Sequence, residues 1–134
     1  MNSIHGTIIN IQQSGGILLA DIDIGNYTVS AMLISSVNGD SWITKGKQVN
    51  VVFKETEVSL AKNLSGKISL RNRFKCTVKD IENGQILSKI VLSFGQNQIV
   101  SVITTRSLLD LDIKSGDAIE ALVKANEISL MTLK

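Results

Sequence analysis

Short runs of apolar and β-branched residues, partly alternating with polar ones, occur in both halves of the chain. The first half has such runs at 6–11, 17–24 and 27–34, separated by Gly-rich and Asn-containing turns. The second half has them at 75–81, 86–94 and 98–104, and 118–133 divides into two runs near Asn126. A period of two with turn residues between the runs predicts short β-strands joined by tight turns.

The two halves align without a gap when the sequence is shifted by 70 positions. Identical residues recur at this spacing, among them Gly25 and Gly95, Gly46 and Gly116, Lys54 and Lys124, Glu57 and Glu127, Ser59 and Ser129, Leu60 and Leu130. Ungapped similarity of this kind indicates a duplication. We therefore predict two domains, 1–64 and 65–134, connected by a short polar linker at 61–67.

A short helix is expected in each repeat, between its third and fourth strands. In the second half Thr104 is a natural N-cap, and Leu108 and Leu111 would face inward over one or two turns. Five short strands and one small helix per half are typical of an OB-like barrel. The predicted fold is all-β, with two tandem five-stranded barrels.

The bulk composition excludes several classes of protein. Fourteen basic and 12 acidic residues give a net charge of only +2, and aromatic residues make up 4% of the chain. Neither number favours a nucleic-acid binder, which needs many cations or a stacking surface. No apolar run approaches a membrane span, and no signal peptide is recognisable. The single cysteine, Cys76, permits no intrachain disulfide and fits a reducing cytoplasm.

The candidate binding-site residues supply hydrogen-bond donors. Thr104, Ser107, Lys124, the amide of Ala125 and the stretch that contains Arg71 supply hydroxyls, cations and N–H groups without an acidic residue. Such a set suits a doubly negative tetrahedral oxyanion, because charge-assisted hydrogen bonds are strong. The amides after Thr104 would also point to the anion from a helix N-terminus. Hydrogen phosphate is disfavoured, since its proton needs an acceptor.

Four motifs carry a family resemblance: Ser69-Leu70-Arg71-Asn72, Val102-Ile103-Thr104-Thr105-Arg106-Ser107, Lys114-Ser115-Gly116-Asp117 and Ala121-Leu122-Val123-Lys124-Ala125. They closely resemble the Mop or TOBE domain, a molybdate- and tungstate-binding module, and the duplicated form resembles the di-Mop molbindins. The resemblance implies a site between domains. One domain would supply Ser69 and Arg71, and a neighbouring domain the donors around Thr104 and Lys124.

The first half departs from this pattern. Lys54 corresponds to Lys124, but the shift of 70 places Met1 at Arg71, Ile34 at Thr104 and Val37 at Ser107. We expect a degenerate first-half site, which Ser35 and Ser36 could restore only in part. Complete sites would then require a second copy of the second half. A homo-oligomer is expected, as a dimer through the second repeats or a trimer of duplicated chains.

The resemblance implies a cytoplasmic molybdate- or tungstate-binding protein that serves molybdenum storage and homeostasis. The alternative is the ligand-sensing domain of a molybdate-responsive transcriptional regulator, which requires a DNA-binding domain that this sequence lacks. A transporter ATPase is not expected without a Walker motif, and an OB-type module for single-stranded nucleic acid is disfavoured by charge. No catalytic set and no cluster of metal-cation ligands is recognisable, so we do not expect an enzyme. Replacing Arg71 or Lys124 by alanine is predicted to weaken anion binding.

Overall fold

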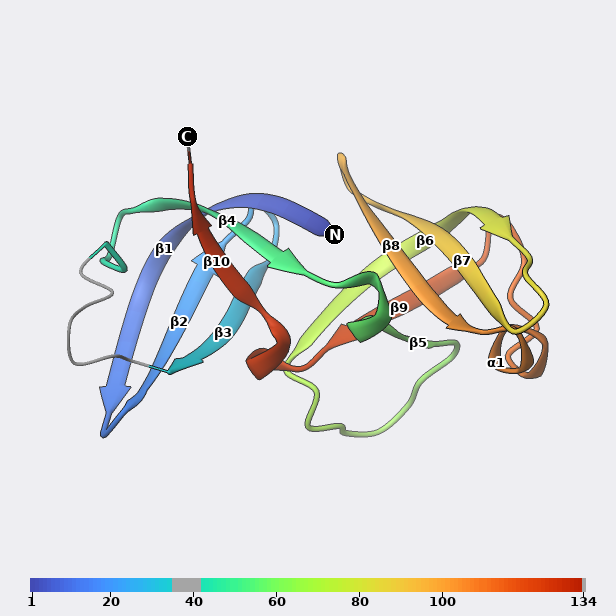
Figure 1. Ribbon diagram of the computed structural model, residues 1–134, viewed down its shortest axis with the longest axis horizontal. Coiled ribbons are helices and arrows are strands. Elements are labelled where there is room, and N and C mark those ends of the chain that lie inside the picture. Colours follow the sequence, from blue (N-terminus) through green and yellow to red (C-terminus); the bar gives the residue numbers. More distant parts are fainter. Residues whose placement is uncertain (35–41, 134) are drawn as a thin grey trace. The chain divides into compact units, whose positions relative to one another are not determined.

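The computed structural model describes residues 1–34 and 42–133 (Figure 1). In chain order the elements are β1 (Asn2–Ser14), β2 (Ile17–Asp23), β3 (Thr28–Ile34), β4 (Gln48–Phe53), the 3-10 turn η1 (Glu55–Glu57), β5 (Ser59–Ala61), β6 (Asn72–Glu82), β7 (Leu87–Phe94), β8 (Asn97–Thr104), α1 (Thr105–Asp110), β9 (Ala118–Val123), the 3-10 turn η2 (Ala125–Glu127) and β10 (Ser129–Thr132). This agrees with the expected all-β architecture. No helix in these two ranges is long and apolar enough to cross a membrane.

The elements repeat with the spacing that the sequence predicted. β1 and β6 begin 70 residues apart, as do β2 and β7, β4 and β9, η1 and η2, and β5 and β10. Even an irregularity recurs, because β1 has a bulge between Ile8 and Asn10, and β6 has one between Val78 and Asp80. A bulge bends its strand and increases its twist, which helps a short sheet to curl. The predicted first-half helix falls on residues outside the described ranges.

The strands form two five-stranded sheets, and each sheet takes one strand from the other half of the sequence. One sheet has the order β5-β9-β6-β7-β8, so β5 from the first half pairs with β9 from the second. The other has the order β10-β4-β1-β2-β3, and β10 from the second half pairs with β4.

The compact units therefore differ from the sequence repeats. The first unit contains Met1–Asn2 and Lys54–Val123, and the second contains Ser3–Phe53 and the chain from Lys124 onward. The division at 64 and 65 remains a proposal about the duplicated segments.

The first unit is held together by apolar side chains from alternate strand positions. Phe74, Ile90, Leu92 and Ile99 are completely buried. Each such side chain contributes about 1.5–3 kcal/mol relative to an exposed one. Phe74 also meets Phe94 edge to face, with 5.1 Å between the ring centroids. This core fixes β6, β7 and β8, the strands whose ends carry the candidate site residues.

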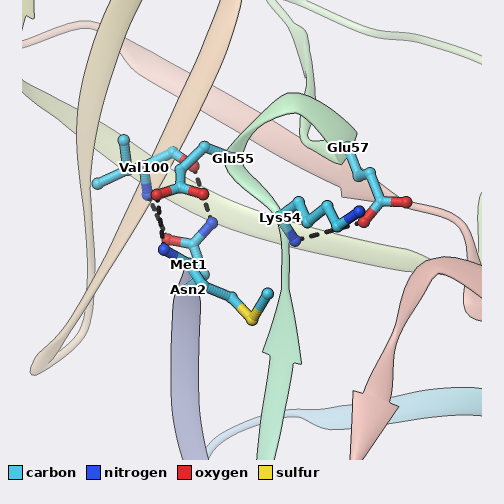
Figure 2. A network of polar contacts seen from close by, with 6 residues as sticks. All are labelled: Met1, Asn2, Lys54, Glu55, Glu57 and Val100. Atoms are coloured by element: carbon cyan, nitrogen blue, oxygen red, sulfur yellow. Dashed lines mark hydrogen bonds and ion pairs between the residues drawn. The ribbon is translucent and has the colours of Figure 1, made fainter.

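The free edge of β8 is capped by a side chain (Figure 2). The Asn2 amide nitrogen donates to the Val100 carbonyl at 2.8 Å, and the Val100 N–H donates to the Asn2 amide oxygen at 2.7 Å. The side-chain amide thus imitates a neighbouring strand and satisfies two edge groups that are otherwise open to non-native pairing. On the same strand, the Ser101 hydroxyl donates to the Val58 carbonyl at 2.7 Å, which holds the chain after η1 against β8.

Candidate oxyanion site

Thr104 and Ser107 lie together at the junction of β8 and α1. Thr104 is the N-cap of α1, as predicted, with extended backbone angles. Its hydroxyl oxygen accepts the Ser107 N–H at 3.1 Å, and its hydroxyl group donates to the Ser107 oxygen at 2.9 Å. Both residues are exposed. The structure therefore brings these two predicted donors together on the surface.

A second set of hydrogen bonds connects this junction to the turn before β7 and to the start of that strand. The Thr105 N–H donates to the Ile86 carbonyl at 2.8 Å, and the Thr105 hydroxyl donates to the Gly84 carbonyl at 2.8 Å. The hydroxyl of Ser88, which is 2% exposed, lies 2.7 Å from that of Thr105. The turn before β7 and the start of α1 consequently hold one geometry, which positions Thr104 and Ser107.

A hollow of about 470 Å³ opens beside the two hydroxyls. Leu87 and Leu111 line it from the second half, together with Thr104 and Ser107. Residues that follow β4 line it from the first half: Thr56, Val58, Ser59 and Leu60. None of the described residues that line this hollow is acidic. Sequence reasoning missed Thr56 and Ser59, because their presence depends on the strand exchange.

Ser69 and Arg71 lie at the other end of the same unit. Both are exposed, and Arg71 immediately precedes β6. The first residue of β6, Asn72, pairs with Val123, the last residue of β9. Because Arg71 precedes Asn72 and Lys124 follows Val123, both cations extend from the same end of the β6–β9 pair. The sequence grouped Lys124 and Ala125 with Thr104; the register of the strands instead associates Lys124 with Arg71.

The two groups of donors are separated by the length of a strand. β6 runs from Asn72 to Glu82, where it pairs with Lys89 near the start of β7. Leu87, the first residue of β7, pairs with Thr104. Eleven extended residues cover about 35 Å. Arg71 and Thr104 of one unit therefore lie about a strand length apart, near opposite ends of β6.

The first-half counterpart of the Arg71 end contains a carboxylate (Figure 2). There Met1 occupies the position of Arg71, and Glu55 the position of Ala125. The Met1 ammonium donates to Glu55 Oε2 at 2.7 Å, and this hydrogen bond lowers the pKa of the Glu55 carboxyl. Lys54 is exposed, and its backbone N–H donates to Glu57 Oε1 at 3.4 Å. An ionised carboxylate at this position disfavours a dianion.

The first-half counterparts of Thr104 and Ser107 add no hydrogen-bond donor among the described residues. Ile34, the counterpart of Thr104, is 75% exposed and has no hydroxyl. Val37, Ser35 and Ser36 lie outside the described residues. Within the described ranges no three His, Cys, Asp or Glu side chains are grouped so that they could hold a metal cation.

Comparison with known proteins places these residues in context. The profile of the TOBE domain family matches residues 68–130, which include Arg71 and the junction at Thr104. Molybdenum-pterin-binding protein 1 of Clostridium pasteurianum is 32% identical over 65 residues, which are 48% of this chain and 96% of that protein.

Two further proteins are also similar. The molybdenum import ATP-binding protein ModC of Brucella abortus (strain 2308) is 28% identical over 117 residues, or 87% of this chain. The chain spans only 31% of the length of that relative. A crystal structure of the cytoplasmic molybdate-binding protein ModG with molybdate bound superimposes with a TM-score of 0.93 and 27% identity, covering 98% of this chain and 96% of that one.

Proposed function

Because this chain belongs to the TOBE-domain family that includes the molybdenum-pterin-binding proteins, we propose that it binds molybdate or tungstate as a tetrahedral dianion. The match to molybdate-bound ModG over nearly the whole chain supports this ligand. The observation that carries the proposal is the exposed Thr104–Ser107 hydroxyl pair, held at the mouth of a hollow without acidic lining residues.

The proposed site is assembled from two copies of the chain. One copy supplies the hydroxyls of Thr104 and Ser107, and the other supplies Ser69, Arg71, Lys124 and the amide of Ala125. The strand register supports this division, because Arg71 and Lys124 extend from one end of the β6–β9 pair and Thr104 ends β8 at the other. The working protein is a homo-oligomer, either a dimer through second repeats or a trimer of duplicated chains.

Each group has a physical role in this site. Arg71 and Lys124 neutralise the two negative charges, and hydroxyl and amide donors satisfy the remaining oxygen lone pairs. Hydrogen phosphate binds poorly, because its O–H finds no carboxylate acceptor. We expect no anion at the first-half position, because Glu55 stands there in place of Ala125 and Ile34 in place of Thr104.

The cellular role that we propose is the binding and storage of molybdate or tungstate in the cytoplasm for molybdenum homeostasis. The chemistry is that of a binding protein, since the site consists of donors and contains no nucleophile paired with a base. ModG, described as cytoplasmic and molybdate-binding, is the solved structure that supports this role.

Titration calorimetry of the purified protein with molybdate, tungstate and sulfate tests the proposal. We expect saturable binding of molybdate or tungstate and much weaker binding of sulfate, which shares the charge but is smaller. Absence of heat with all three anions, at protein concentrations where the protein is oligomeric, would refute the proposed function.

A further inference from the structure

Residues 62–71 connect β5 to β6 in the first unit without a helix or a strand (Figure 1). We call this segment the strap. β5 and β6 both pair antiparallel with β9, one on each side of it, so the strap crosses from one side of β9 to the other. The candidate donors Ser69 and Arg71 lie in the strap, near its second end. The conformation of the strap therefore determines where these two side chains point.

One side chain at the start of the strap reaches the turn between α1 and β9. Lys62 Nζ donates to the Asp112 carbonyl at 2.6 Å and lies 3.1 Å from Asp117 Oδ2. The Lys62 and Asp117 side chains are 26% and 27% exposed, so their ion pair is partly shielded from water. The turn is itself fixed, because Asp117 Oδ2 accepts the Lys114 N–H and the Asp117 carbonyl accepts the Val78 N–H. Lys62 thus fastens the strap to a well-anchored part of the unit.

Two residues beside this contact have an unusual backbone conformation. Asn63, which follows Lys62, has a φ of 57°, and Asp112, whose carbonyl accepts from Lys62, has a φ of 50°. In the described ranges they are the two residues other than glycine with a positive φ. Asn and Asp tolerate this left-handed conformation better than most residues, but it persists only where the surrounding contacts hold it. The Lys62 contact is such a restraint on both segments.

A hollow of about 220 Å³ lies between the strap and the sheet. Asn63 and Leu64 line it from the strap, and Cys76 of β6 and Ile119 of β9 line it from the sheet. Cys76 is 5% exposed in this arrangement. Movement of the strap away from the sheet would open the hollow to solvent, so the reactivity of the Cys76 thiol reports on the strap.

The turn of the first half lacks the Lys62 contact. A shift of 70 places Lys47 at Asp117 and Thr132 at Lys62, so neither the carboxylate nor its lysine partner is present. The turns before β4 and before β9 otherwise make the same two backbone hydrogen bonds, to the bulges of β1 and β6. The barrel therefore forms without a lysine–aspartate contact at this place. The contact accompanies the half of the sequence that has the complete set of candidate donors.

We propose that Lys62 is a positioning residue for oxyanion binding, because it fastens the start of the strap that carries Ser69 and Arg71. The inference rests on the proposed function, in which these two residues donate to the anion. β6 fixes the second end of the strap, and Lys62 reinforces the first end, where β5 has only three residues.

The physical basis is the cost of ordering a flexible segment. A short edge strand separates from its neighbour more easily than a central one, because few contacts hold it. Without the Lys62 contact, separation of β5 from β9 lengthens the mobile part of the chain, and the strap samples more conformations. Binding must then select one of them, which lowers the affinity for the anion. Lys62 acts on the anion through the strap and does not itself touch it.

Molybdate calorimetry and the rate of Cys76 labelling by Ellman's reagent, measured on the same variants, test the proposal. Lys62→Met keeps the length of the side chain but removes its charge. We expect this variant to bind molybdate about three- to tenfold more weakly than the wild type and to label faster. Lys62→Arg should restore both properties. Saturating molybdate should slow the labelling of Lys62→Met, because an anion held by Ser69 and Arg71 fixes the strap at its second end.

Lys114→Met is the matched control, because it removes a lysine from the same turn whose described ion pair is with Asp112 and not with the strap. It should label and bind as the wild type does. Asp117→Asn is a second variant if Lys62→Met fails to fold, which circular dichroism reports. It removes the charged partner of Lys62 but keeps an oxygen for the Lys114 N–H, and it should act in the same direction.

The outcomes separate the parts of the inference. A folded Lys62→Met protein that labels and binds as the wild type does would overturn it. Faster labelling with unchanged affinity would overturn the positioning role. If the wild type binds no oxyanion, the proposed function fails, whereas faster labelling of Lys62→Met than of Lys114→Met would still support the fastened strap.

Discussion

At the scale of single residues, Thr104 and Ser107 have different tasks although both are hydroxyls. The oxygen of Thr104 accepts the Ser107 N–H, and its hydrogen goes to the Ser107 oxygen. Thr104 is therefore engaged in forming the start of α1. The Ser107 hydroxyl accepts from Thr104 and can direct its own hydrogen to a ligand. We therefore predict that Ser107 donates to the ligand, whereas Thr104 acts as the helix cap and can donate to the ligand only if its hydrogen turns away from Ser107.

Alanine substitutions should separate these tasks. Ser107→Ala is expected to weaken molybdate binding by about 1.5–3 kcal/mol, the value of a hydrogen bond to a charged group, without lowering the unfolding temperature. Thr104→Ala should also reduce the free energy of unfolding by about 1 kcal/mol, because the N-cap is lost. Calorimetry and thermal unfolding measure the two effects, with Ser115→Ala in an exposed turn as the control. Equal thermal destabilisation by both substitutions would contradict this division.

Cys76 illustrates a residue whose burial determines its chemistry. It is 5% exposed on β6, and burial raises the pKa of its thiol to about 12. Since the thiolate is the reactive form, we expect almost no reaction with Ellman's reagent at neutral pH in the native protein and one equivalent after unfolding in guanidinium. Rapid stoichiometric labelling of the native protein would show that this part of the unit opens readily.

At the scale of elements, β6 and β9 are joined by a two-point ion pair. Arg73 Nε and Nη2 donate to the two carboxylate oxygens of Glu120 at 2.8 and 2.9 Å. The side chains are 32% and 18% exposed, so the pair is partly shielded from water. The hydrogen bonds from Arg73 lower the pKa of the Glu120 carboxyl. This pair holds together the strands from whose ends Arg71 and Lys124 extend.

The ion pair between Arg73 and Glu120 makes the free energy of unfolding depend on pH. A carboxyl whose pKa is lower in the folded state stabilises the fold above its ordinary pKa, and this contribution is lost as the pH falls through the lowered value. Glu120→Gln should cost about 1 kcal/mol at pH 7 and progressively less below about pH 4. Denaturant unfolding across this range measures it. Glu82→Gln is the control, because its pair with Lys89 is exposed, and an equal loss there would contradict the argument.

Most secondary-structure elements were predictable from the sequence. The strands, the N-cap at Thr104 and the repeat spacing follow from local patterns: alternation, turn residues and capping chemistry. The turn at 114–117 is an example. Gly116 adopts a φ of +90°, the Asp117 N–H donates to the Lys114 carbonyl, and the Lys114 N–H donates to the Asp117 carboxylate. Such signals lie within a few residues and need no knowledge of the tertiary fold.

At the scale of the whole molecule, the grouping of the site residues could not be read from the sequence. The family resemblance grouped Lys124 with Thr104 and Ser107, yet Val123, the neighbour of Lys124, pairs with the residue after Arg71. Strand partners and strand exchange depend on long-range pairing, which local pattern does not encode. For the same reason, the lining of the Thr104 hollow by Thr56 and Ser59 was not anticipated.

A mixing experiment tests whether two copies share a site. Arg71→Ala should disable one end of the unit, and Ser107→Ala the other, so each variant alone binds molybdate weakly at all its sites. In a mixed oligomer, the intact end of one variant can meet the intact end of the other. Random assembly should restore about a quarter of the sites, which calorimetry of the mixture would detect. A mixture no better than its components would place both residues in a site within one copy.

The central claim is that one complete oxyanion site forms per chain, and only between copies. Native mass spectrometry of the protein equilibrated with molybdate measures assembly and anion count together. We predict oligomers that carry one molybdate per chain, and monomers that carry none. A monomer with a full complement of molybdate would contradict the claim, because the two donor groups of a single unit lie at opposite ends of β6.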